Sequence, residues 1–249
     1  NKGLVKTVKF SDPKYVGDPI NAVKIFNEKE VDELMVIDID ATSKNNQPDL
    51  KMIENLAVEC RMPLCYGGGI ATVSQAQQIF SLGVEKIAIS SNALINPAII
   101  TEIADRVGNQ SVVVVLDIKK KKQDGEYEIY THNAKRNTGL DPLDFAVKAE
   151  KAGAGEIVLN SIDNDGVMSG YDMQLIRIIR EAINIPLTVL GGAGSLADIG
   201  SLIQEFGIIG TAAGSLFVFK GKYRAVLINY PTPDEKKGIL SEYFLSHWS

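Results

Sequence analysis

Short apolar runs alternate with amphipathic segments along most of this chain. The runs expected to form strands are residues 34–39, 62–66, 86–90, 112–117, 156–160, 186–190 and 208–211. The segments with helical spacing are residues 20–28, 50–60, 74–82, 97–106, 142–152, 173–182 and 196–206. Continuous apolar runs are typical of parallel strands that are covered on both faces. The pattern therefore predicts repeated strand–helix units, either a (β/α)8 barrel or an open doubly wound sheet.

An internal repeat favours the barrel. Two glycine clusters, Gly67–Gly69 and Gly191–Gly194, each follow a predicted strand and lie 123 residues apart (191 − 68 = 123). Asp40 and Asp163 keep the same offset (163 − 40 = 123). Because two similar halves close naturally into an eightfold barrel, we expect one α/β domain over residues 1–249, a (β/α)8 TIM barrel with a two-fold half-barrel repeat.

Only seven barrel strands are clear in the sequence. Residues 4–10 read as a strand of an exposed hairpin, and the chain has no initiating Met, so we expect the first barrel strand to lie upstream of Asn1. Residues 119–132 predict a second hairpin, which follows the fifth barrel strand. Its run of lysines either binds a phosphorylated substrate or is a solvated strand end.

Composition narrows the class of protein. The chain has 249 residues and a net charge of −5, which argues against a nucleic-acid surface. No apolar run approaches the roughly 18 residues of a membrane helix, and no signal-peptide pattern is present, so we expect a cytoplasmic protein that does not contact membranes. With two cysteines and two histidines, the sequence predicts no disulfide framework, no metal site and no cofactor.

Small residues at strand ends indicate phosphate binding. Glycine directly after a strand lets backbone N–H groups approach an anion, and serine hydroxyls add donors. The residues expected to bind the substrate and its phosphates are Gly68, Gly69, Ser90, Ser91, Asp165, Gly166, Gly191, Gly192, Gly214 and Ser215. Since these residues form symmetric pairs, the sequence predicts one ligand with a phosphate at each end, or two phosphates.

Carboxylates at the same strand ends are the candidates for chemistry. Asp117 closes an apolar strand, where it is expected to act as a general acid or base with a pKa raised by its surroundings. The alternative is that it caps a helix or anchors a loop. Asp38, Asp40, Asp163 and Asp165 either bind ribose hydroxyls, stabilise an imine or cap the next turn.

Charged residues also gather at the opposite ends of the strands. Glu33 precedes the first clear strand, and Lys86 and Glu156 open two others. Alternate strands share a layer of a barrel interior, so these three are expected to form a ring at the bottom. The ring is either a salt-bridged plug or a gate for a small polar molecule. Because one negative charge is left over, we expect a cationic fourth member from the upstream strand.

Several motifs together resemble the cyclase subunit of imidazole glycerol phosphate synthase, from about Gly3 to Phe219. The matching segments are residues 66–70, 116–117, 137–139, 153–157, 161–166, 169–172 and 191–194. The resemblance implies a lyase of histidine biosynthesis, a (β/α)8 barrel that forms a heterodimer with a triad-type glutaminase. Ammonia would enter at the ring, cross the barrel and react with a bis-phosphorylated ribosyl-aminoimidazole. It also implies that Asp117 is one of two catalytic aspartates, the other lying upstream of Asn1, and that Glu33, Lys86 and Glu156 are ammonia-gate residues, the fourth being an upstream arginine.

The chain departs from that family at the barrel mouth. Ser90 stands where asparagine is usual, Asn160 where threonine is usual and Leu190 where serine is usual. Asp40 replaces a threonine, and Lys6 is the match for a family lysine in a shortened segment. These changes resemble a paralogue that delivers ammonia for the amidation of a surface-polysaccharide sugar. A non-catalytic ammonia-channelling subunit is a further alternative, whereas the charged ring argues against the isomerase of the same pathway.

Overall fold

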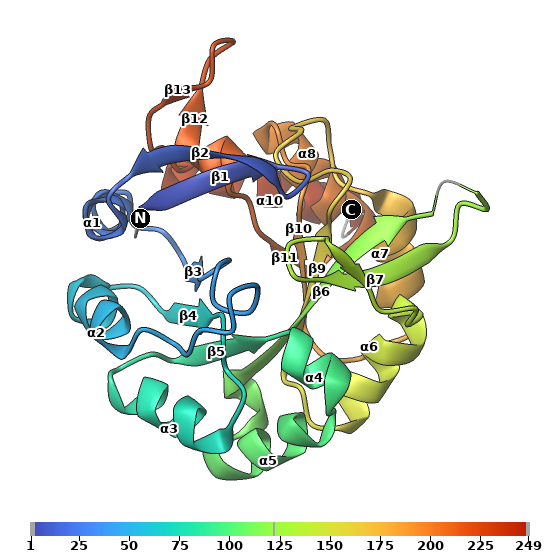
Figure 1. Cartoon of the computed structure of the whole chain (residues 1–249). Coiled ribbons are helices and arrows are strands. Elements are labelled where there is room, and N and C mark those ends of the chain that lie inside the picture. Colours follow the sequence, from blue (N-terminus) through green and yellow to red (C-terminus); the bar gives the residue numbers. More distant parts are fainter. Residues whose placement is uncertain (1–2, 122, 248–249) are drawn as a thin grey trace.

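Seven parallel strands form a curved sheet at the centre of the molecule. The computed structural model describes residues 3–121 and 123–247. The strands are β3 (Leu34–Ile37), β4 (Leu64–Gly67), β5 (Lys86–Ile89), β6 (Val112–Lys120), β9 (Glu156–Ser161), β10 (Leu187–Leu190) and β11 (Gly210–Thr211). Their order is β11-β10-β9-β6-β5-β4-β3, and among the described residues no strand joins β11 to β3. The sheet curls with its helices outside, which is the α/β barrel architecture expected (Figure 1).

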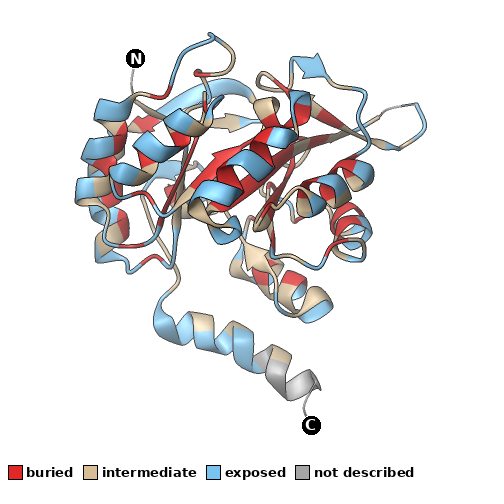
Figure 2. Cartoon of the chain, turned by 90° about the horizontal axis from the view of Figure 1, so that it is seen from below, coloured by how far each residue is buried: buried red, intermediate tan, exposed pale blue. Residues whose placement is uncertain are grey.

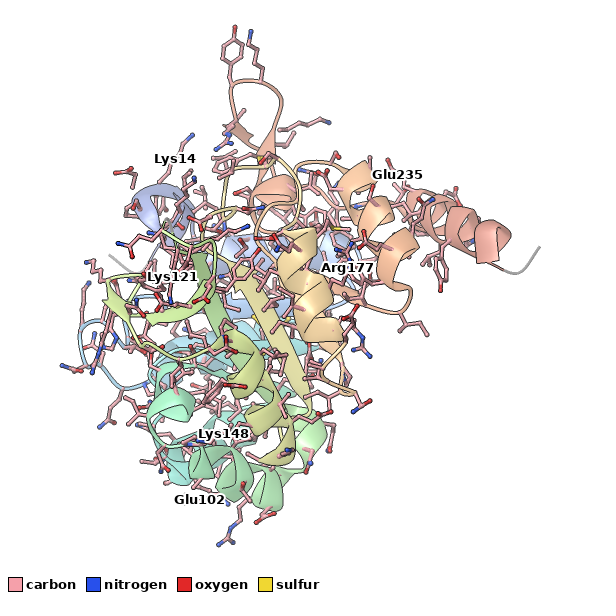
Figure 3. The ribbon with its side chains drawn as sticks, turned by 90° about the vertical axis from the view of Figure 1, so that its right-hand side faces the viewer. Lys14, Glu102, Lys121, Lys148, Arg177 and Glu235 are labelled. Carbon is pink, nitrogen blue, oxygen red and sulfur yellow. The ribbon has the colours of Figure 1, made fainter. Side chains whose placement is uncertain are left out.

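Helices follow the strands and cover the outer face of the sheet. They are α1 (Pro19–Glu28), α2 (Leu50–Glu59), α3 (Val73–Ser81), α5 (Ala98–Val107), α6 (Pro142–Lys151), α7 (Met173–Arg180) and α8 (Leu196–Phe206). Each lies within a residue or two of a predicted segment. Buried residues line the strands and the inner sides of these helices (Figure 2). The charged Glu102, Lys148 and Arg177 lie on the solvent side of α5, α6 and α7 (Figure 3).

The helix starts confirm the internal repeat. Thr72 and Ser195 each form a capping box at the start of α3 and α8, and they lie 123 residues apart (195 − 72 = 123). Asp49 and Asp172 cap α2 and α7 with the same offset (172 − 49 = 123). A side-chain cap satisfies N–H groups that the first helical turn leaves free. By contrast, α5 begins after Pro97 without a side-chain cap.

Successive side chains of each strand point to opposite faces of the sheet, so the strands contribute to two separate apolar clusters. The larger cluster lies between sheet and helices and includes Val112, Val114 and Leu116 of β6. The smaller one consists of inward-facing side chains, which fill the barrel lumen at mid-height. Its buried members are Cys65, Ala88, Val113, Val115 and Val158, with Met35 and Leu190 packed against them.

Additional elements flank the barrel. β1 (Leu4–Val8) pairs with β2 (Ser11–Gly17) in an antiparallel hairpin of its own, as the sequence predicts. The other additions are η1 (Asn109–Ser111), β7 (Tyr127–Thr131), β8 (Arg136–Asn137), β12 (Phe219–Lys220), β13 (Ala225–Val226), α10 (Pro233–His247) and two short helices, α4 (Ser91–Ile95) and α9 (Ser215–Val218). Among the described residues, none of the helices combines the length and apolar character that a membrane crossing requires.

The predicted lysine-rich hairpin is also present, formed by the long β6 and by β7. Lys121 pairs with Glu126 at 3.2 Å and with Glu128 at 3.1 Å, both on the returning side of the hairpin. Lys122 lies outside the described residues. These pairs support the interpretation of Lys121 as part of a strand end, and phosphate binding by the run stays a prediction.

Candidate active site

Asp117 lies where β6 reaches the barrel mouth, on the same strand face as Val113 and Val115. Its carboxylate accepts a hydrogen bond of 2.9 Å from Nδ2 of Asn160 on the neighbouring β9. Burial raises the pKa of Asp117 to about 6, against the lowering effect of this hydrogen bond and with a further increase from the nearby Asp165. A carboxyl group with this pKa can give or take a proton near neutral pH, as the acid–base interpretation requires.

Asn160 was not among the predicted site residues. It is 6% exposed, and its Oδ1 has no hydrogen-bond partner among the described residues. The signal in the sequence was its place two residues after Val158 and four after Glu156, on the inward face of one strand.

A small cavity at the mouth gathers the predicted phosphate residues of the C-terminal half. It is lined by Lys6, Asp165, Gly166, Leu190, Gly191, Gly192, Ala193, Ala213, Gly214 and Ser215. Six of these ten are predicted substrate residues. Lys6 adds a cation, and Ser215 carries a buried hydroxyl without a hydrogen-bond partner among the described residues. The cavity therefore offers a cation, a hydroxyl donor and glycine backbone to an anion.

Two glycines of this wall lie close to other parts of the chain, and at Gly192 a side chain is excluded. Gly192 has φ +123°, and a Cβ there would collide with the carbonyl oxygen of Gly170. A Cβ at Gly214 would meet the ammonium of Lys6, which lies 4.0 Å from Asp165. The Thr7 hydroxyl donates a hydrogen bond of 2.9 Å to the Asp165 carboxylate. The β1–β2 hairpin thus brings Lys6 to the cavity, while Asp165 holds it in place.

The predicted phosphate residues of the N-terminal half do not line this cavity. Gly68 and Gly69 follow β4 with φ values of +120° and +72°. Ser90 precedes α4, and its buried Oγ has no partner among the described residues. Since Ser91 begins α4 after β5 as Ser215 begins α9 after β11 (215 − 91 = 124), the two sets occupy equivalent places in the two halves.

The remaining strand-end carboxylates accept hydrogen bonds or form ion pairs. β3 ends at Ile37, so Asp38 and Asp40 lie in the following turn rather than in the strand. Asp38 accepts the backbone N–H groups of Asp40 and Ala41, and Asp40 pairs with Lys44 at 2.6 Å. Asp163 accepts the backbone N–H of Lys120 at 3.0 Å. The contacts of Asp38 match the turn-capping alternative, whereas Asp163 bonds to the neighbouring strand β6 and not to the turn that follows it.

The three predicted ring residues meet at the opposite end of the barrel. Nζ of Lys86 lies 3.0 Å from Oε2 of Glu33 and 2.9 Å from Oε2 of Glu156. Burial lowers the pKa of Lys86, but its hydrogen bonds to Glu156 and Glu33 outweigh burial and raise the pKa overall. Thr188, which sequence reasoning missed, donates to Oε1 of Glu156 at 2.7 Å. Within the described residues Lys86 is the sole cation paired with these carboxylates, so the cationic fourth member stays a prediction.

The described part of the chain contains no group of three or more His, Cys, Asp or Glu side chains placed to hold a metal ion. The residues that converge at the mouth are a carboxyl group with a raised pKa, an amide, a lysine and small residues.

Comparison with known proteins agrees with this geometry. The family described as "Histidine biosynthesis protein" matches residues 2–224. A Vibrio vulnificus protein named "Putative imidazole glycerol phosphate synthase subunit hisF3" is 57% identical over 239 residues, covering 96% of this chain and 92% of the relative. A Pseudomonas aeruginosa protein with the corresponding name ending in hisF2 is 52% identical over 231 residues, covering 93% of this chain and 92% of the relative.

A more distant relative carries the name without that qualification. The "Imidazole glycerol phosphate synthase subunit HisF" of Alkaliphilus metalliredigens is 39% identical over 214 residues, covering 86% of this chain and 84% of the relative. The match over most of the sequence, together with the barrel and its charged ring, shows that this chain belongs to the histidine biosynthesis protein family.

Proposed function

We propose that this chain is the ammonia-using synthase subunit of an imidazole glycerol phosphate synthase, with Asp117 as an acid–base residue. The names of the relatives support the reaction class. The observation that carries the proposal is the inward face of β9, on which Glu156, Val158 and Asn160 follow one another from the ring to Asp117. One strand thus connects a charged entrance with a titratable carboxyl.

The middle of this route suits neutral ammonia. The lumen layer is built from apolar side chains and the thiol of Cys65, whose pKa is raised by burial and by the nearby Glu33 and Glu156, so that it stays uncharged. An ammonium ion would lose its hydration there without a charged partner, whereas ammonia loses much less. We infer that an ammonium ion loses a proton to water at the ring of Glu33, Lys86 and Glu156, and that neutral ammonia then crosses the layer and emerges beside Asp117.

The acceptor of the ammonia is a ligand with two phosphates. The cavity around Lys6, Gly192 and Ser215 would hold one of them, and the equivalent turns at Gly68, Gly69, Ser90 and Ser91 would hold the other. A ligand held at both ends would lie across the mouth above Asp117. As the new carbon–nitrogen bond forms, the Asp117 carboxylate would accept a proton from the nitrogen and return one to the leaving group.

The direct test supplies the bis-phosphorylated ribosyl-aminoimidazole and ammonium chloride at pH 8.5 to the purified chain. Mass spectrometry should detect imidazole glycerol phosphate and the aminoimidazole carboxamide ribotide in equal amounts. A folded protein that binds inorganic phosphate but forms neither product would reject this reaction.

The pattern of similarity to the relatives favours a second candidate for the molecule that accepts the ammonia. The chain shares 52–57% identity with the relatives named hisF2 and hisF3, but 39% with the Alkaliphilus protein. Leu190 lines the phosphate cavity, and Asn160 contacts Asp117, two of the positions that depart from the family pattern. In this alternative, the same ring and lumen deliver ammonia for the amidation of a surface-polysaccharide sugar.

The two acceptors are distinguished by where the nitrogen goes. We expect label from ¹⁵N-ammonium in the imidazole product if the histidine-type reaction is correct. Label that appears only in an amidated sugar, when an amidotransferase and its sugar substrate are added, would favour the alternative.

The partner that fits the ring is a glutaminase, which would release ammonia at Glu33, Lys86 and Glu156. The word "subunit" in the relatives' names supports a partner in general terms. Co-purification with a triad-type glutaminase, and glutamine-dependent turnover by the pair, would test this assignment. Turnover with glutamine in the absence of any such protein would contradict it.

A further inference from the structure

We propose that Asn160 is an ammonia-binding residue whose side-chain oxygen accepts an N–H from ammonia as it leaves the lumen. The inference rests on the proposed function, because it requires ammonia to travel to Asp117 through the barrel. It assigns a specific task to a side chain that differs from the residue usual in the family.

The orientation of the Asn160 amide is fixed by its neighbour. An ionised carboxylate only accepts hydrogen bonds, so the amide must direct Nδ2 toward Oδ1 of Asp117, 2.9 Å away. Its oxygen is then directed elsewhere. Asn160 is 6% exposed, and its Oδ1 has no hydrogen-bond partner among the described residues. A buried acceptor without a donor costs free energy, so this position calls for a donor.

The residue beside this oxygen is a glycine. A Cβ at Gly191 would lie 3.0 Å from Oδ1 of Asn160, closer than side chains ordinarily pack. Gly191 also lines the phosphate cavity, so the oxygen lies between the catalytic carboxyl and the place where the acceptor's phosphate would bind. A small donor there would be next to both reactants.

Ammonia fits the position better than a larger donor. The apolar layer of Cys65, Ala88, Val113, Val115 and Val158 lies between the ring and the mouth, and it favours a small, neutral molecule. Ammonia has three N–H donors and one lone pair. If it donates to Asn160 and to the free oxygen of Asp117, its lone pair can point toward the acceptor in the mouth.

Nuclear magnetic resonance tests binding without turnover. The labelled protein is titrated with ammonium chloride at pH 7.5 and pH 8.5, and with potassium chloride at equal ionic strength. We expect a saturable shift of the Asn160 side-chain carbonyl, needing about tenfold less total ammonium at pH 8.5 because the neutral form binds. No shift, an equal shift with potassium chloride, or saturation at the same ammonium concentration at both pH values would overturn the proposal.

Kinetics provide the second readout. Asn160→Leu should raise the KM for ammonia about tenfold, as expected for one lost hydrogen bond, while the KM for the phosphorylated acceptor stays unchanged. The acid limb of the pH profile should move to higher pH, because the hydrogen bond that lowers the Asp117 pKa is lost. If the KM values for ammonia and for the acceptor rose equally and the pH profile did not move, the role of Asn160 would be merely structural and the proposal would be overturned.

Two further variants control these results. Asn160→Thr should recover part of the ammonia affinity, since a hydroxyl can donate to Asp117 and accept from ammonia at once. Ser161→Ala removes a similarly buried side chain from the next position of β9 and should leave both KM values unchanged. If no acceptor is turned over, the ammonia-dependent shift still supports this inference and only the proposed reaction fails. Turnover without that shift overturns the inference alone.

Discussion

At the scale of single residues, burial and hydrogen bonding act in opposite directions on the pKa values of Asp117 and Lys86. Asp117 directly follows the apolar part of β6, is partly buried and retains one amide donor, so desolvation dominates and raises its pKa to about 6. Lys86 shows the opposite balance, since two carboxylates overcome the cost of its burial. The same fold thus weakens an acid at one end of the lumen and stabilises a cation at the other.

The raised pKa of Asp117 predicts a stability cost at high pH. The folded state binds this proton more tightly than the unfolded state, so stability is lost as pH rises from about 4 to about 6 and stays lower above that. Asp117→Asn should therefore raise the free energy of unfolding at pH 8 by up to about 3 kcal/mol, and by much less at pH 4. Urea denaturation at both pH values measures the difference; an equal effect at both would contradict this origin.

Removing the central cation of the ring should have the opposite effect. Lys86→Met leaves Glu33 and Glu156 facing each other without a counter-charge, which should lower the free energy of unfolding by about 1 kcal/mol at pH 7. Lys148→Met on the exposed side of α6 is the matched control, and a comparable loss there would show that the ring is not responsible.

At the scale of elements, the sequence predicted types and order well but missed short or contact-dependent features. The strands followed from short apolar runs, and the long helices followed from helical periodicity. The short α4 and α9 have too few turns to show a period, so the sequence showed only small residues there. Asn160 and Thr188 were missed because their roles depend on which strand lies beside them.

The repeated capping boxes offer a paired test of the half-barrel symmetry. Thr72→Ala and Ser195→Ala each remove an equivalent cap, so each should lower the free energy of unfolding by about 1 kcal/mol. Thermal and urea unfolding of the two variants should agree closely. A large effect in one half with none in the other would show that the two halves do not contribute equally to stability.

A substitution in the turn after β11 should weaken phosphate binding without changing the stability of the fold. Gly214 has a negative φ, so alanine causes no backbone strain there, but its Cβ would displace the flexible end of Lys6. Gly214→Ala should keep normal stability and weaken inorganic phosphate binding about tenfold, measured by calorimetry. Gly238→Ala is the control, because a Cβ there meets no atom within 4 Å. Unchanged phosphate affinity in Gly214→Ala would exclude Lys6 from the site.

At the scale of the whole molecule, the two ends of the barrel carry different chemistry. The ring lies at the start of the strands and Asp117 at their carboxyl ends, with an uncharged apolar layer between them. The sequence indicated both ends, because strand starts and strand ends can be located from the apolar runs. It did not indicate the lumen contacts, which depend on the register of neighbouring strands.

The central claim is that Asp117 transfers a proton when ammonia reaches the acceptor in the mouth. The most direct measurement is the rate at which ¹⁵N from ammonium chloride enters the imidazole product, compared between the native chain and Asp117→Asn. We predict labelled product from the native chain and a rate at least about 100-fold lower in Asp117→Asn, with phosphate affinity unchanged. Equal rates of ¹⁵N incorporation in the two proteins would contradict the account.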